Sequence, residues 1–541
     1  MIYFLRVKIN KLIMMRIYNI IFTVVAAFIG LTSTAQIRET TDRQINKLGQ
    51  TLFFLNNYYL DSLDNNKLVD IAITSILGEL DPHSSYVTAK DVKAMNEPLE
   101  GNFEGVGIEY AIIRDTLTVS APIAGGPCES AGIRAGDKII AVDSESIASK
   151  GLTNQDVQKY LRGPKGTRVK LDVVRKGEKD VLSFEIIRDK IPINSLDAGY
   201  EVSPGVVYLK LSRFAATSSR EIIDALIGMN IKKINGVILD LRGNTGGYLG
   251  TALEIANFFL ERDQTIVYTE GMRVPKMIER ANGSGFYKTG PLAILIDEGS
   301  ASGSEIVAGA IQDWDRGAII GRRSFGKGLV QQMLPLNDGS QLRLTVARYH
   351  TPSGRVIQMP YEKGNSKDYY LDHIERYQRG EYFSKDSIAL PDSLKYKTLL
   401  INRDVYGGGG IMPDIFVPAD TTYYSDYLSV LIRRNILIDY INSYSDLNRA
   451  KLHSKYPDFD TFSQYFVVEE KTLKSLYDYA AEKGIPHDSQ GVAKSENQIA
   501  VNIKALIART LFGMTGYYKV INSDGDKAFA KAVEFISSGT L

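Results

Sequence analysis

Residues 235–247 read NGVILDLRGNTGG, and this stretch decides the fold class. Its first half is a short apolar run with the length of a buried strand, and its second half is a glycine-rich turn. Residues 249–260, which follow, place apolar side chains at helical spacing. The same order recurs at 292–314, where the apolar run LAILI precedes a turn and a second helical stretch. Repeated strand, turn and helix units predict an α/β core in which loops at the carboxyl ends of strands carry the chemistry.

The sequence changes character on both sides of this core, which we expect to span residues 191–420. Residues 36–100 have the three- and four-residue apolar spacing of helices, and residues 421–541 are predicted to be helical as well. Residues 101–190 alternate short β-branched runs with glycine turns, which predicts a small β-rich module with strands at 105–110, 116–120, 138–142, 168–174 and 182–187. A chain of 541 residues is too long for one hydrophobic core. We therefore expect a multidomain α/β protein.

The first 35 residues have the pattern of a secretory signal peptide. Basic residues precede an almost uncharged apolar run at 17–31, and small residues follow at 33–35. We expect cleavage after Ala35 and export of the mature chain to the periplasm. The apolar run is shorter than the roughly twenty residues that a spanning helix needs. Attachment to the membrane through an uncleaved segment stays open as the alternative.

Charge and cysteine content exclude several classes of protein. The chain has 64 basic and 63 acidic residues, so no net field attracts nucleic acid, and we expect no such partner. The single cysteine, Cys128, excludes intrachain disulfides and cysteine-rich zinc sites. The five histidines never stand four residues apart, the spacing of a helical metal site. Metal catalysis is disfavoured, and no cofactor is predicted.

Residues 299–305 read GSASGSE and bring Ser300, Ser302 and Ser304 between an apolar strand and the start of a helix. A serine at such a turn is accessible and can attack a substrate as a nucleophile. The free N–H groups at the start of the helix can then stabilise the negative charge that develops on the substrate. Serine is also a favoured helix N-cap residue. The motif alone therefore leaves a structural cap open, and it does not choose among the three serines.

A serine nucleophile needs a base, and Lys327 in the segment SFGKG is the best candidate. Flanking glycines allow a lysine to enter an enclosed site, where desolvation lowers the pKa of its amine toward neutrality. Gln331 follows on the same face of a predicted strand and could hold the amine by a hydrogen bond. A phosphate-binding loop is excluded, because the Walker-type glycine spacing is missing. The rival base is His350, with Asp313 as its partner.

Taken together, these motifs resemble those of the carboxyl-terminal processing proteases, also called tail-specific proteases. In that family the nucleophile is the middle serine of a Ser-Ala-Ser-Ala-Ser-Glu-like segment, and the lysine follows 25 residues later. Here 327 − 302 = 25, so the resemblance selects Ser302 as nucleophile and Lys327 as base, with Gln331 completing the site. It also implies an oxyanion hole formed by Gly247 and Gly303, and a crotonase-like α/β core.

The β-rich module resembles a PDZ domain. The segment Gly105, Val106, Gly107 and Ile108 is similar to the loop whose backbone N–H groups hold a peptide's terminal carboxylate. Residues 132–140, GIRAGDKII, match the turn and strand that follow in such domains. A lone Gly-x-Gly would indicate no more than a hairpin, but both motifs stand at the expected distance. The resemblance as a whole covers roughly residues 40–420.

These resemblances imply an exported serine endopeptidase that holds the C-terminal tail of a protein in its PDZ domain and cleaves nearby. The expected partners are proteins or peptides with exposed apolar C-termini, while a homo-oligomer or an adaptor protein stays open. Two rivals remain: a PDZ scaffold that binds tails without cutting them, and a hydrolase that uses His350. The role of residues 421–541 is not predicted.

Overall fold

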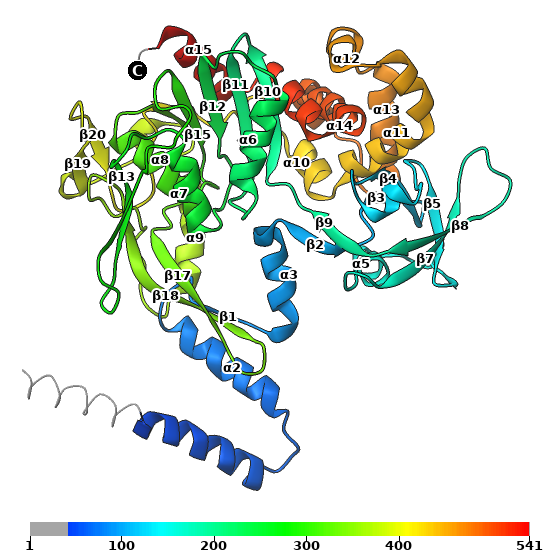
Figure 1. Ribbon diagram of the computed structural model, residues 1–541. Helices are drawn as coiled ribbons and strands as arrows, with labels where there is room; N and C mark the ends of the chain where they lie inside the picture. The colour runs from blue at the N-terminus through cyan, green and yellow to red at the C-terminus, as the bar shows by residue number, and fades with distance from the viewer. Residues whose placement is uncertain (1–41, 540–541) are drawn as a thin grey trace, which may run out of the picture. The chain divides into compact units, whose positions relative to one another are not determined.

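The computed structural model describes residues 42–539, and the chain divides into two units, residues 1–75 and 76–541. The first unit contains a helix over residues 42–58 and most of α2 (Asn65–Gly78) (Figure 1). Both helices follow the apolar spacing of the sequence, which confirms the helical prediction for this part of the chain. The predicted signal peptide lies outside the described residues.

The second unit is built on a six-stranded sheet. Its strands in spatial order are β10 (Leu196–Ser203), β11 (Val206–Leu211), β12 (Gly236–Asp240), β15 (Leu292–Ile296), β16 (Ala318–Gly321) and β21 (Ile415–Phe416). β10 runs antiparallel to β11, and the other neighbours are parallel. Every residue of β12 and β15 is buried, as expected for parallel strands covered on both faces. The predicted strand, turn and helix units are confirmed.

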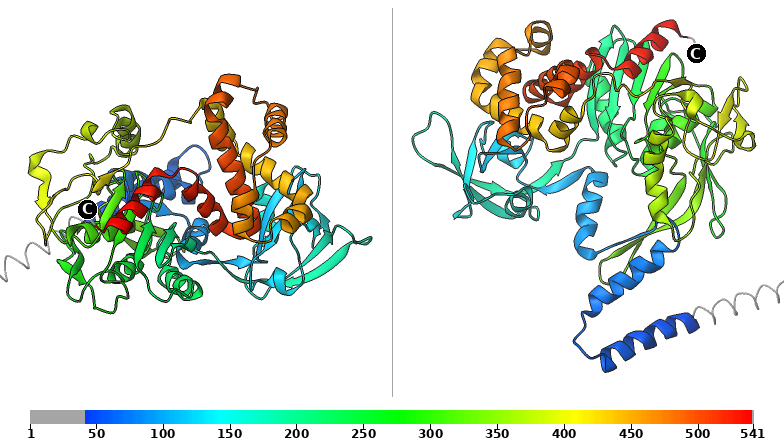
Figure 2. Two further views of the ribbon diagram at one scale, coloured as in Figure 1. Left: turned by 90° about the horizontal axis from the view of Figure 1, so that it is seen from above. Right: turned by 180° about the vertical axis from the view of Figure 1, so that it is seen from behind.

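Helices cover both faces of this sheet. Alternate residues of β12 point to opposite faces, and their neighbours show which helices cover each face. Val237 and Leu239 share a core with helices on one face, whereas Ile238 packs with α15 (Lys527–Ser538) on the other. The helices of the first face are α6 (Ser218–Gly228), α7 (Leu249–Asn257) and α8 (Gly303–Asp313). Both views of Figure 2 show α15 lying against the sheet. The last helix therefore belongs to the core, although it falls within the predicted C-terminal helical region.

The segment that contains Lys327 leads into the first strand of a β-hairpin in a second sheet. Its strands are β1 (Ser85–Val87), β13 (Thr265–Glu270), β14 (Met277–Arg280), β17 (Leu329–Pro335) and β18 (Gln341–His350). β17 and β18 form an antiparallel hairpin, and β1 pairs with the same residues of β18 on its other edge. β1 is a strand inside the stretch predicted to be helical, because pairing with β18 outweighs the helical spacing of the preceding residues. Helix α9 (Ser366–Gln378) and the hairpin of β19 (Lys395–Lys397) and β20 (Asp404–Tyr406) follow.

The β-rich module follows α3 (Ala89–Glu100) and has its own sheet and core. Its elements are β3 (Ile108–Ile113), β4 (Thr116–Pro122), α4 (Pro127–Ser130), β5 (Lys138–Val142), β6 (Glu145–Ser146), α5 (Asn154–Leu161), β7 (Arg168–Val174) and β8 (Leu182–Ile187). The chain enters through β2 (Asn102–Gly105) and leaves through β9 (Asp189–Pro192), and these two strands pair with each other. The predicted strands at 138–142, 168–174 and 182–187 are confirmed at both ends. The strand predicted over 105–110 is interrupted by a turn at Val106 and Gly107.

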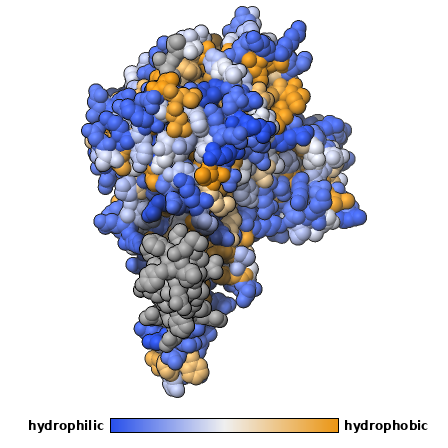
Figure 3. Space-filling model, turned by 60° about the vertical axis from the view of Figure 1, so that its left-hand side comes forward, coloured by the Kyte–Doolittle hydropathy of each residue, from blue (hydrophilic) through white to orange (hydrophobic). Residues whose placement is uncertain are grey.

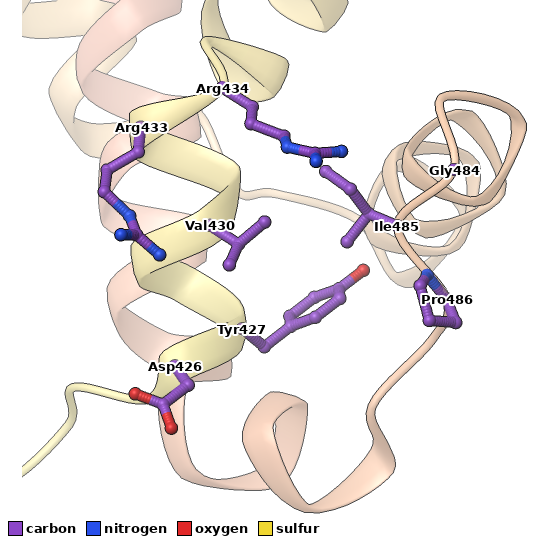
Figure 4. A pocket seen from close by; sticks show the side chains of 8 residues that line it. All are labelled: Asp426, Tyr427, Val430, Arg433, Arg434, Gly484, Ile485 and Pro486. Atoms are coloured by element: carbon purple, nitrogen blue, oxygen red, sulfur yellow. The ribbon is translucent and has the colours of Figure 1, made fainter.

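Residues 426–523 fold into helices with a separate core that includes Phe462, Leu476, Ile499 and Ile503. The helices are α10 (Asp426–Arg433), α11 (Ile436–Lys455), α12 (Phe459–Tyr465), α13 (Glu470–Glu482) and α14 (Ser489–Ser523). A pocket of about 580 Å³ lies between α10 and the loop that follows α13. Figure 4 shows the side chains that line it. Its lining contains none of the predicted catalytic residues.

The face drawn in Figure 3 is largely hydrophilic, with apolar residues gathered in separate patches. Across residues 42–539, every helix is too short or too polar to cross a bilayer.

Candidate active site

Ser302 stands at the sharp turn between β15 and α8. Its backbone has φ 54° and ψ −110°, a region that side-chain-bearing residues rarely adopt. Such strain costs of order 1–3 kcal/mol and persists only where surrounding contacts hold it. One of these contacts is the hydrogen bond from the Ser302 N–H to Glu305 Oε2, at 2.8 Å. Strain of this kind is a frequent mark of a functional residue.

The neighbouring serines have structural roles. Ser300 and Ser304 are fully buried. The Ser300 hydroxyl donates to the carbonyl of Leu241, and the Ser304 hydroxyl donates to the carbonyl of Asn244, both at 2.8 Å. Ser302 is only partly buried. Of the three serines that the sequence left open, Ser302 is therefore the one whose side chain a substrate can approach.

A glycine turn meets Ser302 from a different part of the chain. A Cβ placed on Gly246 would lie 2.7 Å from Ser302 Cβ and 3.0 Å from the Gly303 nitrogen, so only glycine fits. Gly247 is held on Phe214 by a β-bridge. Within the described residues, the N–H groups of Gly247 and Gly303 have no acceptor in a turn, loop or strand. Two free donors beside a serine form the arrangement that an oxyanion hole requires.

Lys327 lies in the loop before β17. Its Nζ donates to Gln331 Oε1 at 3.2 Å, and Gln331 Nε2 donates to the carbonyl of His83 at 2.8 Å. Burial lowers the pKa of the Lys327 amine, and the positive charge of Arg343 lowers it further, although two carboxylates act in the opposite direction. A lysine with a lowered pKa can accept a proton as a general base.

Glu305 joins the serine turn to the lysine loop. This carboxylate is fully buried, and its Oε2 accepts the N–H groups of both Ser302 and Lys327 at 2.8 Å. Its Oε1 accepts the Gly326 N–H at 2.7 Å and the Ser324 hydroxyl at 2.6 Å. Sequence reasoning did not assign this role. The available signal was Ser302 followed three residues later by Glu305, the pattern of a helix capping box.

The structure does not support the rival base. His350 stacks on Tyr268 with ring centroids 4.4 Å apart and an interplanar angle of 6°. Asp313 is fully buried and pairs with Arg355 at 2.7 Å. Each member of the proposed His350 and Asp313 pair therefore has a different structural partner, and the Ser-His-Asp hypothesis loses its geometric basis.

The predicted peptide-binding loop of the β-rich module lies between β2 and β3. β3 is an edge strand of its sheet, so an added peptide strand could pair with it. Gly105 ends β2, Ile108 begins β3, and Gly107 adopts φ 80° in the turn between them. Among the turn and loop hydrogen bonds of the described chain, none is donated by the Val106 or Gly107 N–H, and Gly105 forms a β-bridge with Arg162. The loop thus lies next to a strand edge with which no other strand of the described chain pairs, and α11 also contacts β3.

Three family descriptions match separate parts of the chain. Residues 205–369 match peptidase family S41, and residues 118–175 match the PDZ domain. Residues 427–513, within the C-terminal helices, match a family of unknown function, DUF8443. The protease match contains Ser302 and Lys327, and the PDZ match falls within the β-rich module.

Curated relatives extend this result over most of the chain. The carboxy-terminal processing protease CtpB of Bacillus subtilis is 33% identical over 386 residues, which are 70% of this chain and 76% of that protein. The carboxy-terminal-processing protease of Bartonella bacilliformis is 36% identical over 354 residues, 63% of this chain and 80% of the relative. Among solved structures, the photosystem II D1 C-terminal processing protease is 26% identical and covers 70% of this chain and 87% of its own, with a TM-score of 0.36 that is too low to strengthen the fold assignment. The chain therefore belongs to the carboxy-terminal processing proteases of peptidase family S41, and it is a serine-type peptidase that carries a PDZ domain.

Proposed function

We propose that this peptidase is an exported endopeptidase with a Ser302 and Lys327 catalytic pair. The observation that carries the proposal is the buried Glu305 carboxylate, which binds the backbone N–H groups of both residues. Because one buried carboxylate binds both loops, the distance and orientation between the serine and the lysine are more constrained than they would be in independent loops. Gln331 fixes the lysine amine from the other side.

In this mechanism Ser302 Oγ attacks the scissile carbonyl carbon while the neutral amine of Lys327 takes the hydroxyl proton. The oxyanion receives hydrogen bonds from the N–H groups of Gly247 and Gly303. Lys327 then gives its proton to the leaving amine, and the C–N bond breaks to leave an acyl-enzyme. Water, deprotonated by the same amine, attacks the ester carbonyl carbon. As the C–Oγ bond breaks, the protonated amine returns the proton to Ser302 Oγ, and the acid product leaves. Gln331 orients the amine throughout.

The PDZ domain, in this proposal, selects substrates by their C-termini. The N–H groups of Val106 and Gly107 receive the terminal carboxylate, and the preceding residues of the substrate extend the sheet along β3. An apolar last side chain would lie beside Ile108. Proteins with exposed apolar tails are therefore the proposed substrate class.

Export is proposed from the sequence of residues 1–35, which has the basic, apolar and small-residue regions of a signal peptide. The mature chain would then act in the periplasm. N-terminal sequencing of the chain recovered from a periplasmic extract tests this. A chain that begins near residue 36 supports export and cleavage, and one that remains in the cytoplasm with its original start contradicts both.

Active-site substitution tests the catalytic assignment. Ser302→Ala and Lys327→Ala should each abolish cleavage of an unfolded protein while the thermal unfolding midpoint stays close to that of the wild type. Exposed residues of the same type serve as matched controls, Ser203→Ala and Lys363→Ala. Substantial cleavage by Ser302→Ala, or full activity of Lys327→Ala, would refute the pair.

Wild-type activity should also rise with pH. Only the neutral amine accepts a proton, so the rate follows the deprotonation of Lys327. Because burial lowers the pKa of this amine, the midpoint should lie below the free-lysine value of about 10.4. A rate that does not change across this range would argue against lysine as the base.

A further inference from the structure

Arg343 lies on the strand that backs the catalytic lysine, although sequence reasoning gave it no role. On β18, Thr345 is paired with Gln331, and Arg343 is paired with Met333 two residues further along β17. Residues two apart on a strand share a face. Arg343 therefore stands on the face of the hairpin that carries Gln331, the residue that binds the Lys327 amine.

The guanidinium of Arg343 lies beside α3 and close enough to Tyr248 to act on it electrostatically. One terminal nitrogen contacts Asn96 Oδ1 of α3 at 3.4 Å, and the charge acts electrostatically on Tyr248, the residue directly after the Gly247 turn. Nε of Arg343 is buried and has no hydrogen-bond partner in the described chain. Burial lowers the pKa of this guanidinium and Tyr248 acts in the opposite direction, and no carboxylate of residues 42–539 is among the charges that act on it. Its charge is thus not neutralised by an ion pair.

Charged and titratable groups from several elements face Lys327. Glu305 of α8 and Asp81 of the loop before β1 both raise the pKa of the amine, whereas burial and Arg343 lower it. His83, also in the loop before β1, carries no compensating charge at neutral pH, because burial and the charge of Lys327 lower its pKa to about 4. Among the charges that act on Lys327, Arg343 therefore lowers the pKa of the amine, whereas the two carboxylates raise it.

We propose that Arg343 is a positioning residue for the base, and that its positive charge keeps the Lys327 amine in the neutral form that can accept the serine proton. The inference rests on the proposed role of Lys327. Arginine suits the task, because its guanidinium stays protonated at any pH at which the enzyme works. A lysine at 343 would keep the charge, whereas an amide or a thioether would remove it.

The first test is the pH dependence of kcat/KM for Arg343→Gln, with Arg343→Met as a second variant that preserves more of the apolar stem. Removing the charge should move the midpoint of the profile to higher pH. Since each pH unit below the midpoint is a factor of ten in neutral amine, we expect a loss of about three- to tenfold near pH 7 that shrinks above the midpoint. Arg343→Lys should restore the wild-type profile.

Arg348→Gln is the matched control, because Arg348 lies exposed on the same strand and is not among the charges that act on Lys327. It should leave the profile unchanged. A rise in KM for Arg343→Gln with an unchanged midpoint would mean that Arg343 binds substrate, and would overturn the proposal. A midpoint that moves equally in Arg348→Gln would also overturn it, since the effect would not belong to position 343.

A second measurement separates this proposal from the assignment of Lys327 as base. Trace acetylation with acetic anhydride, followed by mass spectrometry of the Lys327 peptide, reports the neutral fraction of this amine without reference to activity. The acetylation midpoint should be higher in Arg343→Gln and Arg343→Met than in wild type and Arg343→Lys. An unchanged acetylation midpoint refutes the role of Arg343, whatever the activity shows. A shifted acetylation midpoint with pH-independent cleavage supports Arg343 and refutes the lysine base.

Discussion

Replacing Glu305 by glutamine tests the contact that joins the Ser302 turn to the Lys327 loop. The side chain keeps its shape, but one oxygen that accepts hydrogen bonds becomes an NH₂ group that donates them. If the NH₂ takes the place of Oε2, it faces the N–H groups of Ser302 and Lys327. If it takes the place of Oε1, it faces the Gly326 N–H and the Ser324 hydroxyl, and that hydroxyl can rotate to accept. The second orientation leaves one backbone donor unsatisfied instead of two.

The expected loss of stability follows from the number of hydrogen-bond donors left without an acceptor. One buried unsatisfied N–H costs about 1–3 kcal/mol, and the remaining bonds lose the extra strength of a charged acceptor. We expect Glu305→Gln to reduce the free energy of unfolding by about 2–4 kcal/mol, a large part of the 5–15 kcal/mol typical of a folded domain. Glu305→Ala should cost more, because it leaves all four donors without their acceptor.

Urea unfolding and peptide cleavage are the two assays. Cleavage by Glu305→Gln should fall even at temperatures where the variant is fully folded, because the relation between Ser302 and Lys327 loosens. The exposed Glu362→Gln is the control and should match the wild type in both assays. Unchanged stability together with an unchanged rate in Glu305→Gln would refute the view that this carboxylate holds the site together.

Three further outcomes are expected. With the Ser302→Ala protein, fluorescence anisotropy should show that a peptide with a free C-terminus binds about tenfold more tightly than its amidated form, because charge-assisted bonds are the stronger ones. Equal affinities would contradict the proposal that the PDZ domain binds the terminal carboxylate. Gly246→Ala should abolish activity, because the added Cβ would lie 2.7 Å from Ser302 Cβ, whereas Gly250→Ala, with open space around it, should retain activity and gain up to about 1 kcal/mol of stability. The pKa of His83 is lowered from about 6.5 to about 4 in the folded chain. Between these pH values the unfolded state binds a proton at this histidine and the folded state does not, so the free energy of unfolding decreases as the pH falls. The difference between the urea midpoints at pH 7 and pH 4.5 should therefore be smaller in His83→Gln, and an equal difference would contradict this assignment.

The sequence by itself determined the elements whose pattern is local. The strands at 138–142, 168–174, 182–187 and 292–296 have the predicted limits, because apolar β-branched runs between glycine turns specify a strand without help from distant residues. Local spacing, read through the family resemblance, also selected Ser302 and Lys327. The helical character of residues 426–538 followed from periodicity in the same way.

Tertiary structure decided which of these segments meet. Gly246 touches Ser302 across 56 residues of chain, and Gln331 contacts the carbonyl of His83 across 248 residues. The helix at the end of the chain returns to the central sheet, and a strand forms at Ser85–Val87 because β18 lies beside it. The tasks of Glu305 and Arg343 likewise depend on burial and on neighbours from other elements. Such contacts depend on how strands and helices pack together. Periodicity along the sequence shows which face of an element is apolar, but it does not specify the element that packs against that face.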